Sequence, residues 1–457
     1  MELAEKLEIL AAGARYDASC ATSGSTRQGK VGRSLPAGVC HSFAGDGRCV
    51  SLLKLLYSNV CRFDCAYCMN RVSNDMARTS FTTEELVRLT ISFYKRNYIE
   101  GLFLSSGIFA DPDIVMERLI AVARALRADS GFGGYIHLKA IPGCGDRLLR
   151  EAGLYADRLS ANIELPNAVS LASLAPDKSG REILGAMRYI GESCAETRED
   201  RKRITSTPGF APAGQSTQVI IGATPDSDRN ILGLAQGLYG RYGLRRVYYS
   251  AYLPVRSDSR LPSGSPPLLR EHRLYQADWL LRFYGFRAEE ILEATGDNLA
   301  SDLDPKSSWA LAHPDFFPVE LSRAGLGELL RVPGLGAVSA KRIIECRRAA
   351  RLRPEDLPRL GLVMKRARYF IALYGKRLAG IPEPAELRAF LADRPALEAP
   401  PGSPTGPSPE GGWTAPATGP ASLPAGAAAA AMAGSRAGRQ PGALAAAAIG
   451  QLEFAFP

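Results

Sequence analysis

The chain has 457 residues, enough for two or three domains or for one barrel with appendages. Its hydrophobic fraction of 46% and charged fraction of 23% are ordinary for a globular protein, and its apolar runs fall short of the roughly 18 residues that suggest a membrane span. The formal net charge of +9 favours a polyanionic partner. With no secretory signal at the start, we expect a cytoplasmic protein, where clustered cysteines are more often metal ligands than disulfides.

The first 250 residues predict a parallel barrel. After a short amphipathic helix in MELAEKLEILAAG, residues 1–50 form an irregular extension that contains cysteines, and strand-like runs then alternate with helix-like runs from 51 to 252. The expected strands are Ser51–Tyr57, Gly101–Ser105, Tyr135–Ile141, Arg158–Glu164, Gln218–Gly222 and Arg246–Ala251. The expected helices are Thr82–Asn97, Asp113–Ala128, Arg181–Glu192 and Ser227–Arg241. Such alternation predicts βαβ units, and here an α/β fold with a partial (β/α)6 barrel whose active site lies at the carboxyl ends of the strands.

Three further segments follow the barrel. Residues 253–320 are expected to form a connector with one amphipathic helix at Leu268–Tyr284. Residues 321–380 are basic and predict a small all-α module. From 397 to 457 the composition is dominated by Ala, Pro and Gly, which cannot bury enough apolar surface to fold, so we expect a disordered tail.

A cysteine motif follows the first strand of the barrel. Cys61, Cys65 and Cys68 stand as Cys-x3-Cys-x2-Cys, with Tyr67 before the last cysteine. Three thiolates can bind three irons of a [4Fe–4S] cluster and leave the fourth open to the amino and carboxylate groups of a methionine. The alternative is a zinc site, which needs four ligands and would have to recruit Cys40 or Cys49.

This motif, with an aromatic residue before the third cysteine, resembles the signature of the radical S-adenosylmethionine (SAM) superfamily. The resemblance implies a [4Fe–4S] cluster and SAM as cofactors, and an electron donor such as flavodoxin or ferredoxin. It also implies that further residues contact SAM at the strand ends. Those expected to do so, with Tyr67, are Ser105, Ser106 and Gly107 after the second strand, Ser160, Asn162 and Glu164 on the fourth, and Gln218 and Gly222 on the fifth.

Other cysteines allow further hypotheses. Cys20, Cys40 and Cys49 could ligate a second metal centre, although small buried hydrophobic residues are the simpler interpretation. Cys144 follows the third strand, in Pro142-Gly143-Cys144-Gly145, at the expected active face. It is a candidate donor of a hydrogen atom to a substrate radical, against the alternative of an ordinary cysteine in a loop.

The basic module contains a sequence that resembles a helix-hairpin-helix motif. In residues 332–343, VPGLGAVSAKRI, glycines allow close approach to a phosphate, and the following helix offers unpaired amides and its positive dipole end. A weaker second copy spans 357–368. Residues 331–377 carry thirteen Lys and Arg against three Asp and Glu, a net charge of +10. The residues expected to bind DNA are Gly334, Gly336, Lys341, Arg342, Lys365 and Arg366. A solvated helical bundle that binds a protein is the alternative.

Several stretches resemble one family of radical SAM proteins associated with DNA modification or repair. They are YKRNYIEGLFLSSG at 94–107, GYIHLKAIPG at 134–143, DRLSANIELP at 157–166 and LRVPGLGAVSAKRI at 330–343. The resemblance covers about residues 15–380 and implies a partner that resembles uracil-DNA glycosylases. We therefore expect a radical enzyme that acts on DNA. The alternatives are a radical SAM enzyme that modifies tRNA or rRNA, and an iron–sulfur DNA sensor without turnover.

The last residues suggest a docking peptide. Gln451, Leu452, Phe454 and Phe456 in QLEFAFP resemble the peptide by which bacterial replication and repair proteins bind the sliding clamp, although Phe454 stands where Leu or Met is usual. Apolar residues at the end of a flexible tether suit insertion into pockets of a partner. An arbitrary terminus, or a segment that packs on the barrel, is the alternative.

Overall fold

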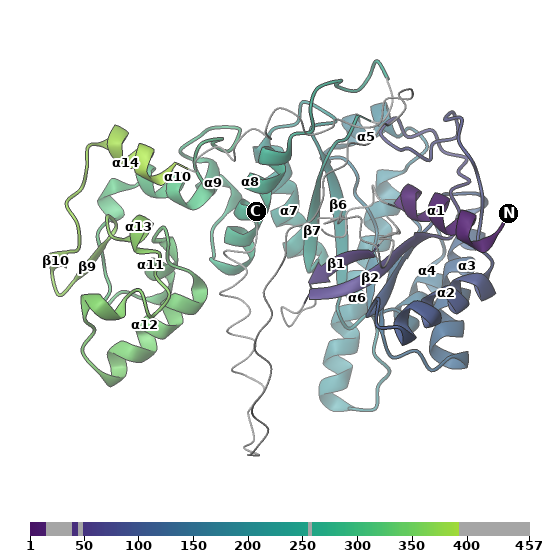
Figure 1. Ribbon diagram of the computed structural model, residues 1–457, viewed down its shortest axis with the longest axis horizontal. Coiled ribbons are helices and arrows are strands. Elements are labelled where there is room, and N and C mark those ends of the chain that lie inside the picture. The colour runs from purple at the N-terminus through teal and green to yellow at the C-terminus, as the bar shows by residue number, and fades with distance from the viewer. Residues whose placement is uncertain (15–38, 44–48, 255–257, 393–457) are drawn as a thin grey trace, which may run out of the picture.

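The computed structural model describes residues 1–14, 39–43, 49–254 and 258–392. Seven strands form one sheet in sequence order, and the sheet curls into a partial barrel (Figure 1). The strands are β1 (Val39–Phe43), β2 (Cys49–Leu56), β3 (Gly101–Ser105), β4 (Tyr135–Lys139), β5 (Arg158–Ser160), β6 (Gln215–Ile221) and β7 (Arg246–Ala251). β2 to β7 run parallel, and β1 pairs antiparallel with β2. The six parallel strands confirm the predicted partial barrel.

Helices alternate with these strands and cover the outside of the curl. They are α1 (Leu3–Ala14), α2 (Thr83–Lys95), α3 (Pro112–Arg124), the π-helix η1 (Ala125–Asp129), α4 (Asp146–Tyr155), α5 (Ala168–Leu174), α6 (Gly180–Arg203) and α7 (Asp228–Tyr242). α2 begins where the sequence predicts, because Thr82 and Glu85 form a reciprocal capping box. α6 continues eleven residues beyond the expected Glu192, from Ser193 to Arg203.

The two faces of the sheet differ in chemistry. Leu53 and Leu102 are fully buried in the main apolar core under the helices. Their neighbours along each strand point the other way, since side chains alternate across a strand. We call this inner surface the lumen. It is mainly polar, and its residues include Lys54, Phe103, Ser105, Tyr135, His137, Lys139, Arg158, Ser160, Ser216, Gln218, Arg246 and Tyr248.

Two expectations for the barrel need correction. Residues 1–50 are not irregular throughout, because β1 adds an antiparallel strand, and five residues of mixed polarity give too weak a pattern to predict it. The fifth strand, β5, is shorter than the expected Arg158–Glu164. The chain leaves the strand after Ser160, and Glu164 has a positive φ of 67°, which an extended strand cannot contain.

The connector and the basic module lie beside the barrel (Figure 1). The connector contains α8 (Leu268–Phe283), as expected, and also α9 (Ala288–Leu292), α10 (Pro305–Ala312) and the 3-10 turn η2 (Pro314–Phe316). The remaining elements are β8 (Val319–Glu320), α11 (Leu326–Arg331), α12 (Ala337–Ala349), the 3-10 turn η3 (Pro354–Asp356), α13 (Met364–Ala367), β9 (Ile371–Leu373), β10 (Lys376–Arg377) and α14 (Pro384–Leu391).

The module is therefore not purely helical. β8, β9 and β10 form a three-stranded sheet, with β8 parallel and β10 antiparallel to β9. Strands of two or three residues are too short to show alternation in a sequence. Between β9 and β10, Tyr374 and Gly375 have φ of 49° and 77°, the pair of left-handed residues that a tight hairpin turn uses.

Polar contacts tie the connector to the module. Lys306 Nζ donates to the Leu335 carbonyl at 2.6 Å, and Arg366 forms an ion pair with Asp304 at 2.8 Å. Arg331 pairs with Glu290 at 2.9 Å. The first contact holds the loop between α11 and α12 against α10, the second joins α13 to the start of α10, and the third joins α11 to α9.

In the part of the chain that the structure describes, no helix is both long and apolar enough to cross a bilayer. The expected tail, 397–457, lies outside the described residues, as does the docking peptide at Gln451–Phe456.

Candidate functional site

The cysteine motif lies in the loop that follows β2, at the carboxyl ends of the strands. Backbone hydrogen bonds attach this loop to the chain beyond β3: Gly107 N donates to Ser58 O at 2.7 Å, and Arg62 N donates to Ile108 O at 2.8 Å. A Cβ on Gly107 would lie 2.4 Å from the Val60 carbonyl oxygen. Only glycine permits this approach, so Gly107 holds the two loops together.

One arginine fixes the shape of the loop. The Arg78 guanidinium donates to the carbonyls of Asn59, Asn70, Arg71 and Asn74 at 2.5 to 3.0 Å. A single planar cation thus joins the two arms on either side of the cysteines. Sequence reasoning missed Arg78, because nothing local in Met76-Ala77-Arg78 distinguishes it from a surface arginine.

The three thiols lie together on this frame. Cys65 is buried, while Cys61 and Cys68 are partly exposed, and Cys68 N donates to Cys65 O at 2.9 Å in a tight turn. Burial raises the pKa of Cys65 to about 11 and that of Cys68 to about 12, and the neighbouring cysteines add to both shifts. Without a metal both groups are therefore protonated thiols, and binding to iron would release the protons.

The donor set of this loop is three cysteine thiols, the number that a [4Fe–4S] cluster with one open iron needs. In residues 1–14, 39–43, 49–254 and 258–392, no three His, Cys, Asp or Glu side chains are grouped to hold one metal ion. A [4Fe–4S] cluster binds each thiolate through a different iron, which sets the three sulfurs farther apart than one ion would. The side chains of Cys40 and Cys49, the possible fourth zinc ligands, lie outside what the structure describes.

A partly buried ion pair lies beside the thiols. Lys178 Nζ contacts Glu164 Oε1 at 2.6 Å and lies 5.9 Å from the centre of the Tyr67 ring. Despite burial, Glu164, Tyr67 and Cys65 hold the pKa of Lys178 well above its ordinary value, so the side chain remains an ammonium. Lys178 in turn offsets part of the rise that burial causes in the pKa of Cys65 and Cys68. Sequence reasoning predicted Glu164 and Tyr67 but missed Lys178, which precedes α6 in a loop far along the chain.

The predicted polar residues on and just after β5, and on β6, meet in the lumen. Lys139 donates to the Asn162 side-chain oxygen, and Asn162 donates to Gln218 Oε1 at 3.4 Å. Ser160 Oγ lies 2.9 Å from His137 Nε2. Burial and then the cations Arg158, Lys139 and Lys54 hold the pKa of His137 well below its ordinary value, so its ring is neutral.

Other predicted residues occupy separate places. Ser105 ends β3 in the lumen, and Ser106 Oγ donates to the Gly107 carbonyl at 2.8 Å. Gly222 follows β6 with a φ of 81°, and a Cβ there would lie 2.6 Å from Pro267 Cγ. Cys144 lies beyond β4, where burial raises its thiol pKa to about 12, which keeps the S–H bond that a hydrogen donor needs. Cys20 lies outside the described residues.

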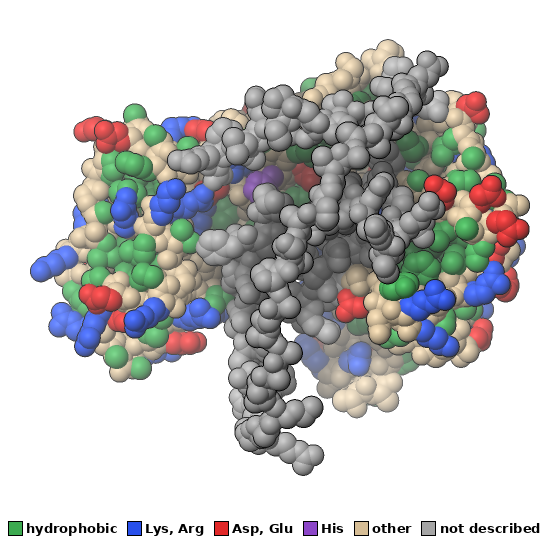
Figure 2. Space-filling model, viewed as in Figure 1, with side chains coloured by type: hydrophobic (Ala, Val, Ile, Leu, Met, Phe, Trp, Pro, Cys, Tyr) green, Lys and Arg blue, Asp and Glu red, His purple; other side chains and the backbone are tan. Residues whose placement is uncertain are grey.

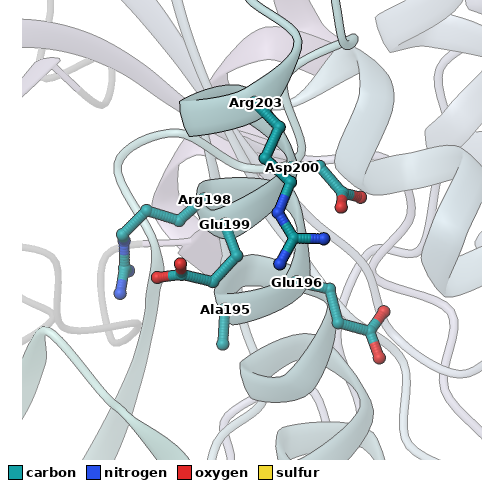
Figure 3. A pocket seen from close by; sticks show the side chains of 6 residues that line it. All are labelled: Ala195, Glu196, Arg198, Glu199, Asp200 and Arg203. Atoms are coloured by element: carbon teal, nitrogen blue, oxygen red, sulfur yellow. The ribbon is translucent and has the colours of Figure 1, made fainter.

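The surface also carries a pocket whose lining residues do not belong to this site. Its six lining residues all belong to the second half of α6, and their side chains spread from one helix (Figure 3). No second element supplies a lining residue, so the pocket offers little to enclose a ligand. The pocket is lined by Ala195, Glu196, Arg198, Glu199, Asp200 and Arg203.

Comparison with known proteins supports the predicted superfamily. The model of the Radical SAM superfamily matches residues 55–195, which contain the thiol loop, β3 to β5 and Lys178. No match to the chain was found among the curated proteins.

Matches among the solved structures include three kinds of protein. HydG, a maturase of the [FeFe]-hydrogenase, is 16% identical with a TM-score of 0.36, over 50% of this chain and 48% of HydG. Methylornithine synthase (PylB) is 18% identical with a TM-score of 0.35, over 60% and 66%. Streptococcus suis SuiB, bound to its precursor peptide SuiA, is 14% identical with a TM-score of 0.35, over 57% and 50%. The match thus spans about half the length of HydG.

The family match confirms the expected cofactors. Residues 55–195 match the model of the radical SAM superfamily, whose enzymes use a [4Fe–4S] cluster and S-adenosylmethionine.

Proposed function

We propose that this chain is a radical SAM enzyme that acts on DNA, in modification or repair. When bound, the cluster and SAM supply a 5′-deoxyadenosyl radical, which can take hydrogen from carbons that acid–base groups cannot activate. Cys61, Cys65 and Cys68 are the residues that would bind the cluster.

The chain's own residues would position SAM between the thiols and the lumen. Lys178 offers a fixed ammonium beside the thiols, suited to a carboxylate. Asn162, Glu164 and Gln218 offer amide and carboxylate groups for hydroxyls and amines. The mainly polar lumen behind them suits a polar substrate.

The loop between α11 and α12 carries the proposal of DNA as substrate. Gly334 has a φ of 76°, and a Cβ there would lie 2.8 Å from the Val363 carbonyl oxygen, so the hairpin requires glycine. Gly336 is the N-cap of α12 and supplies no side chain to bond the first amides of that helix. Lys341 and Arg342 follow on α12 and are exposed. Free amides, a helix N-terminus and nearby cations are what a phosphate needs.

The second copy of the motif packs against the first. Val363 N donates to Gly334 O at 2.9 Å, and Ser339 Oγ donates to Gly361 O at 2.9 Å. Gly361 also has a positive φ, of 92°. Lys365 is exposed and available for a phosphate, whereas Arg366 pairs with Asp304 and is better assigned to holding the module on the connector.

The charge of the module supports a nucleic acid. Lys and Arg side chains are spread over this part of the molecule, at the left of Figure 2. With the net charge of +10 over residues 331–377, the module would attract a polyanion from any direction and hold it by its backbone. The barrel would then have to recognise the DNA sequence. A base could enter the barrel only from single-stranded or locally opened DNA.

The competing functions are radical modification of tRNA or rRNA and an iron–sulfur sensor that binds DNA without turnover. Mass spectrometry of nucleosides from DNA and from RNA, in cells with and without the gene, separates them. A modified deoxynucleoside that changes with the gene supports the proposal. A change confined to RNA nucleosides, or none together with no 5′-deoxyadenosine from the purified protein, overturns it.

The proposal extends to partners. Enzymes of this superfamily need an electron donor, and in the cytoplasm flavodoxin or ferredoxin could serve. A partner resembling uracil-DNA glycosylases would suit a repair role.

Residues 451–456 are proposed to dock on the sliding clamp, and a peptide of residues 447–457 should bind purified clamp at micromolar levels. Failure to bind at millimolar peptide would end that part of the proposal.

A further inference from the structure

The lumen contains a buried guanidinium that donates a hydrogen bond to a neutral phenol. Arg158, the first residue of β5, is only 4% exposed, and its Nε donates to the Tyr135 hydroxyl at 2.8 Å. Burying a cation is costly unless an anion or several strong acceptors compensate it, and one phenol oxygen is a weak substitute for a carboxylate. The environment of Arg158 therefore suits an anionic group brought by a ligand.

Three buried polar atoms around this arginine point to the same conclusion. In the described residues, His137 Nδ1, Ser216 Oγ and Tyr248 Oη have no hydrogen-bond partner, and all three residues are at most 2% exposed. Orphaned buried polar atoms are rare in native proteins, because each one loses its bonds to water. Here three occur on one surface of three strands.

The register brings these groups to one region of the lumen. His137 is the partner of Arg158 across β4 and β5, and Ser216 is the partner of Arg246 across β6 and β7. The Arg246 guanidinium lies 5.0 Å from the centre of the Tyr248 ring. Two guanidinium groups with hydroxyl and imidazole groups around them match the acceptor oxygens of an oxyanion such as phosphate.

We propose that the lumen binds the phosphate of a nucleotide substrate, with Arg158, Ser216 and Tyr248 as its ligands. Naming a nucleotide rests on the function proposed above. Arg158 is the first residue of β5 and Asn162 follows the end of this strand, so the phosphate site lies toward the amino ends of the strands, away from the end that faces the thiols. A nucleotide held by its phosphate would present its sugar and base toward that end. The phosphate can come from a free nucleotide or from the 5′ end of a DNA strand.

Two adjacent tyrosines give a matched test. Tyr248 Oη is orphaned in the lumen, whereas Tyr249 Oη, on the opposite face of β7, donates to Asp278 at 3.1 Å. Tyr248→Phe should leave the melting temperature unchanged and weaken phosphate binding about tenfold, the loss of one hydrogen bond to a charged group. Tyr249→Phe should lower the melting temperature and leave phosphate binding unchanged. Ser216→Ala should behave as Tyr248→Phe does.

The probes are deoxynucleoside 5′-monophosphates, the matching nucleosides, and oligodeoxynucleotides with and without a 5′ phosphate, titrated calorimetrically into the anaerobically reconstituted full chain. Binding at least about tenfold tighter with the phosphate, in either the free or the oligonucleotide series, supports the site and identifies the source of the phosphate. Equal binding with and without phosphate overturns it, as does the same affinity for Tyr248→Phe and Tyr249→Phe.

Repeating the titration in a Lys341→Glu, Arg342→Glu background separates the two proposals. If the module does not bind DNA, free monophosphates still bind the lumen with the same affinity. If the lumen site is wrong, the phosphate preference is missing in both backgrounds while DNA binding by the module is unaffected.

Discussion

Basic side chains serve two different purposes in the barrel and in the module. In the lumen Arg158 is buried and held by Tyr135, and its neighbours are fixed by the register of the strands. On the module Lys341 and Arg342 extend into solvent from α12. A buried cation selects a ligand of defined shape, whereas exposed cations attract any polyanion and are screened by salt. Under the proposed function, the barrel would supply chemistry and selectivity, and the module would capture DNA.

The largest expected effect that separates the two roles comes from a substitution at the thiols. Cys65→Ala should abolish formation of 5′-deoxyadenosine from SAM under reducing conditions, because an iron of the cluster loses its ligand, while DNA binding by the module is retained. Cys194→Ala, on α6, is the matched control and should keep both properties. Wild-type amounts of 5′-deoxyadenosine from Cys65→Ala would contradict the assignment.

The converse change is on the module. A Lys341→Glu, Arg342→Glu double variant should weaken DNA binding about 100-fold at moderate salt and reduce the slope of log affinity against log salt by about 2, as expected for two lost phosphate contacts. SAM cleavage without DNA should be unchanged. Lys95 and Arg96, the same exposed pair of residues at the end of α2, provide the control. Equal effects of the two double variants on DNA binding would show that the module has no special part.

Substitutions of Lys178 test whether binding of SAM depends on the ammonium group beside the thiols. Lys178→Met removes the ammonium that contacts Glu164 and should raise the KM for SAM about tenfold, as expected for one lost charge-assisted hydrogen bond. Lys178→Arg keeps the charge and should recover part of the loss. If Met and Arg variants give the same KM as wild type, Lys178 only stabilises the loop.

The smallest expected effect comes from the hairpin. Gly334→Ala should destabilise the module by about 1 kcal/mol, because a Cβ conflicts both with the positive φ and with the Val363 carbonyl. Gly327→Ala on α11 meets nothing within 4 Å and should be neutral or slightly stabilising. Thermal unfolding of both variants measures the difference, and equal melting temperatures would show that the hairpin tolerates a side chain.

The sequence was informative wherever a pattern repeats along the chain. All six parallel strands and the thiol loop follow from apolar runs and cysteine spacing. The second half of α6 was missed because Cys194–Arg203 is polar on almost every side and shows no helical period. Arg158 and Tyr248 could not be predicted as single residues. A polar residue within a strand can be assigned to the lumen only once the curl of the sheet is known. Lys178 was missed because its partner, Glu164, is 14 residues away across α5.

Transfer of hydrogen tests the central claim most directly. The reduced protein should be incubated with SAM and fully deuterated DNA, and the 5′-deoxyadenosine analysed by mass spectrometry. A radical SAM enzyme that acts on DNA predicts deuterium in 5′-deoxyadenosine, and no deuterium when deuterated RNA replaces the DNA. Formation of 5′-deoxyadenosine without deuterium, from protein that demonstrably binds the DNA, would contradict the account.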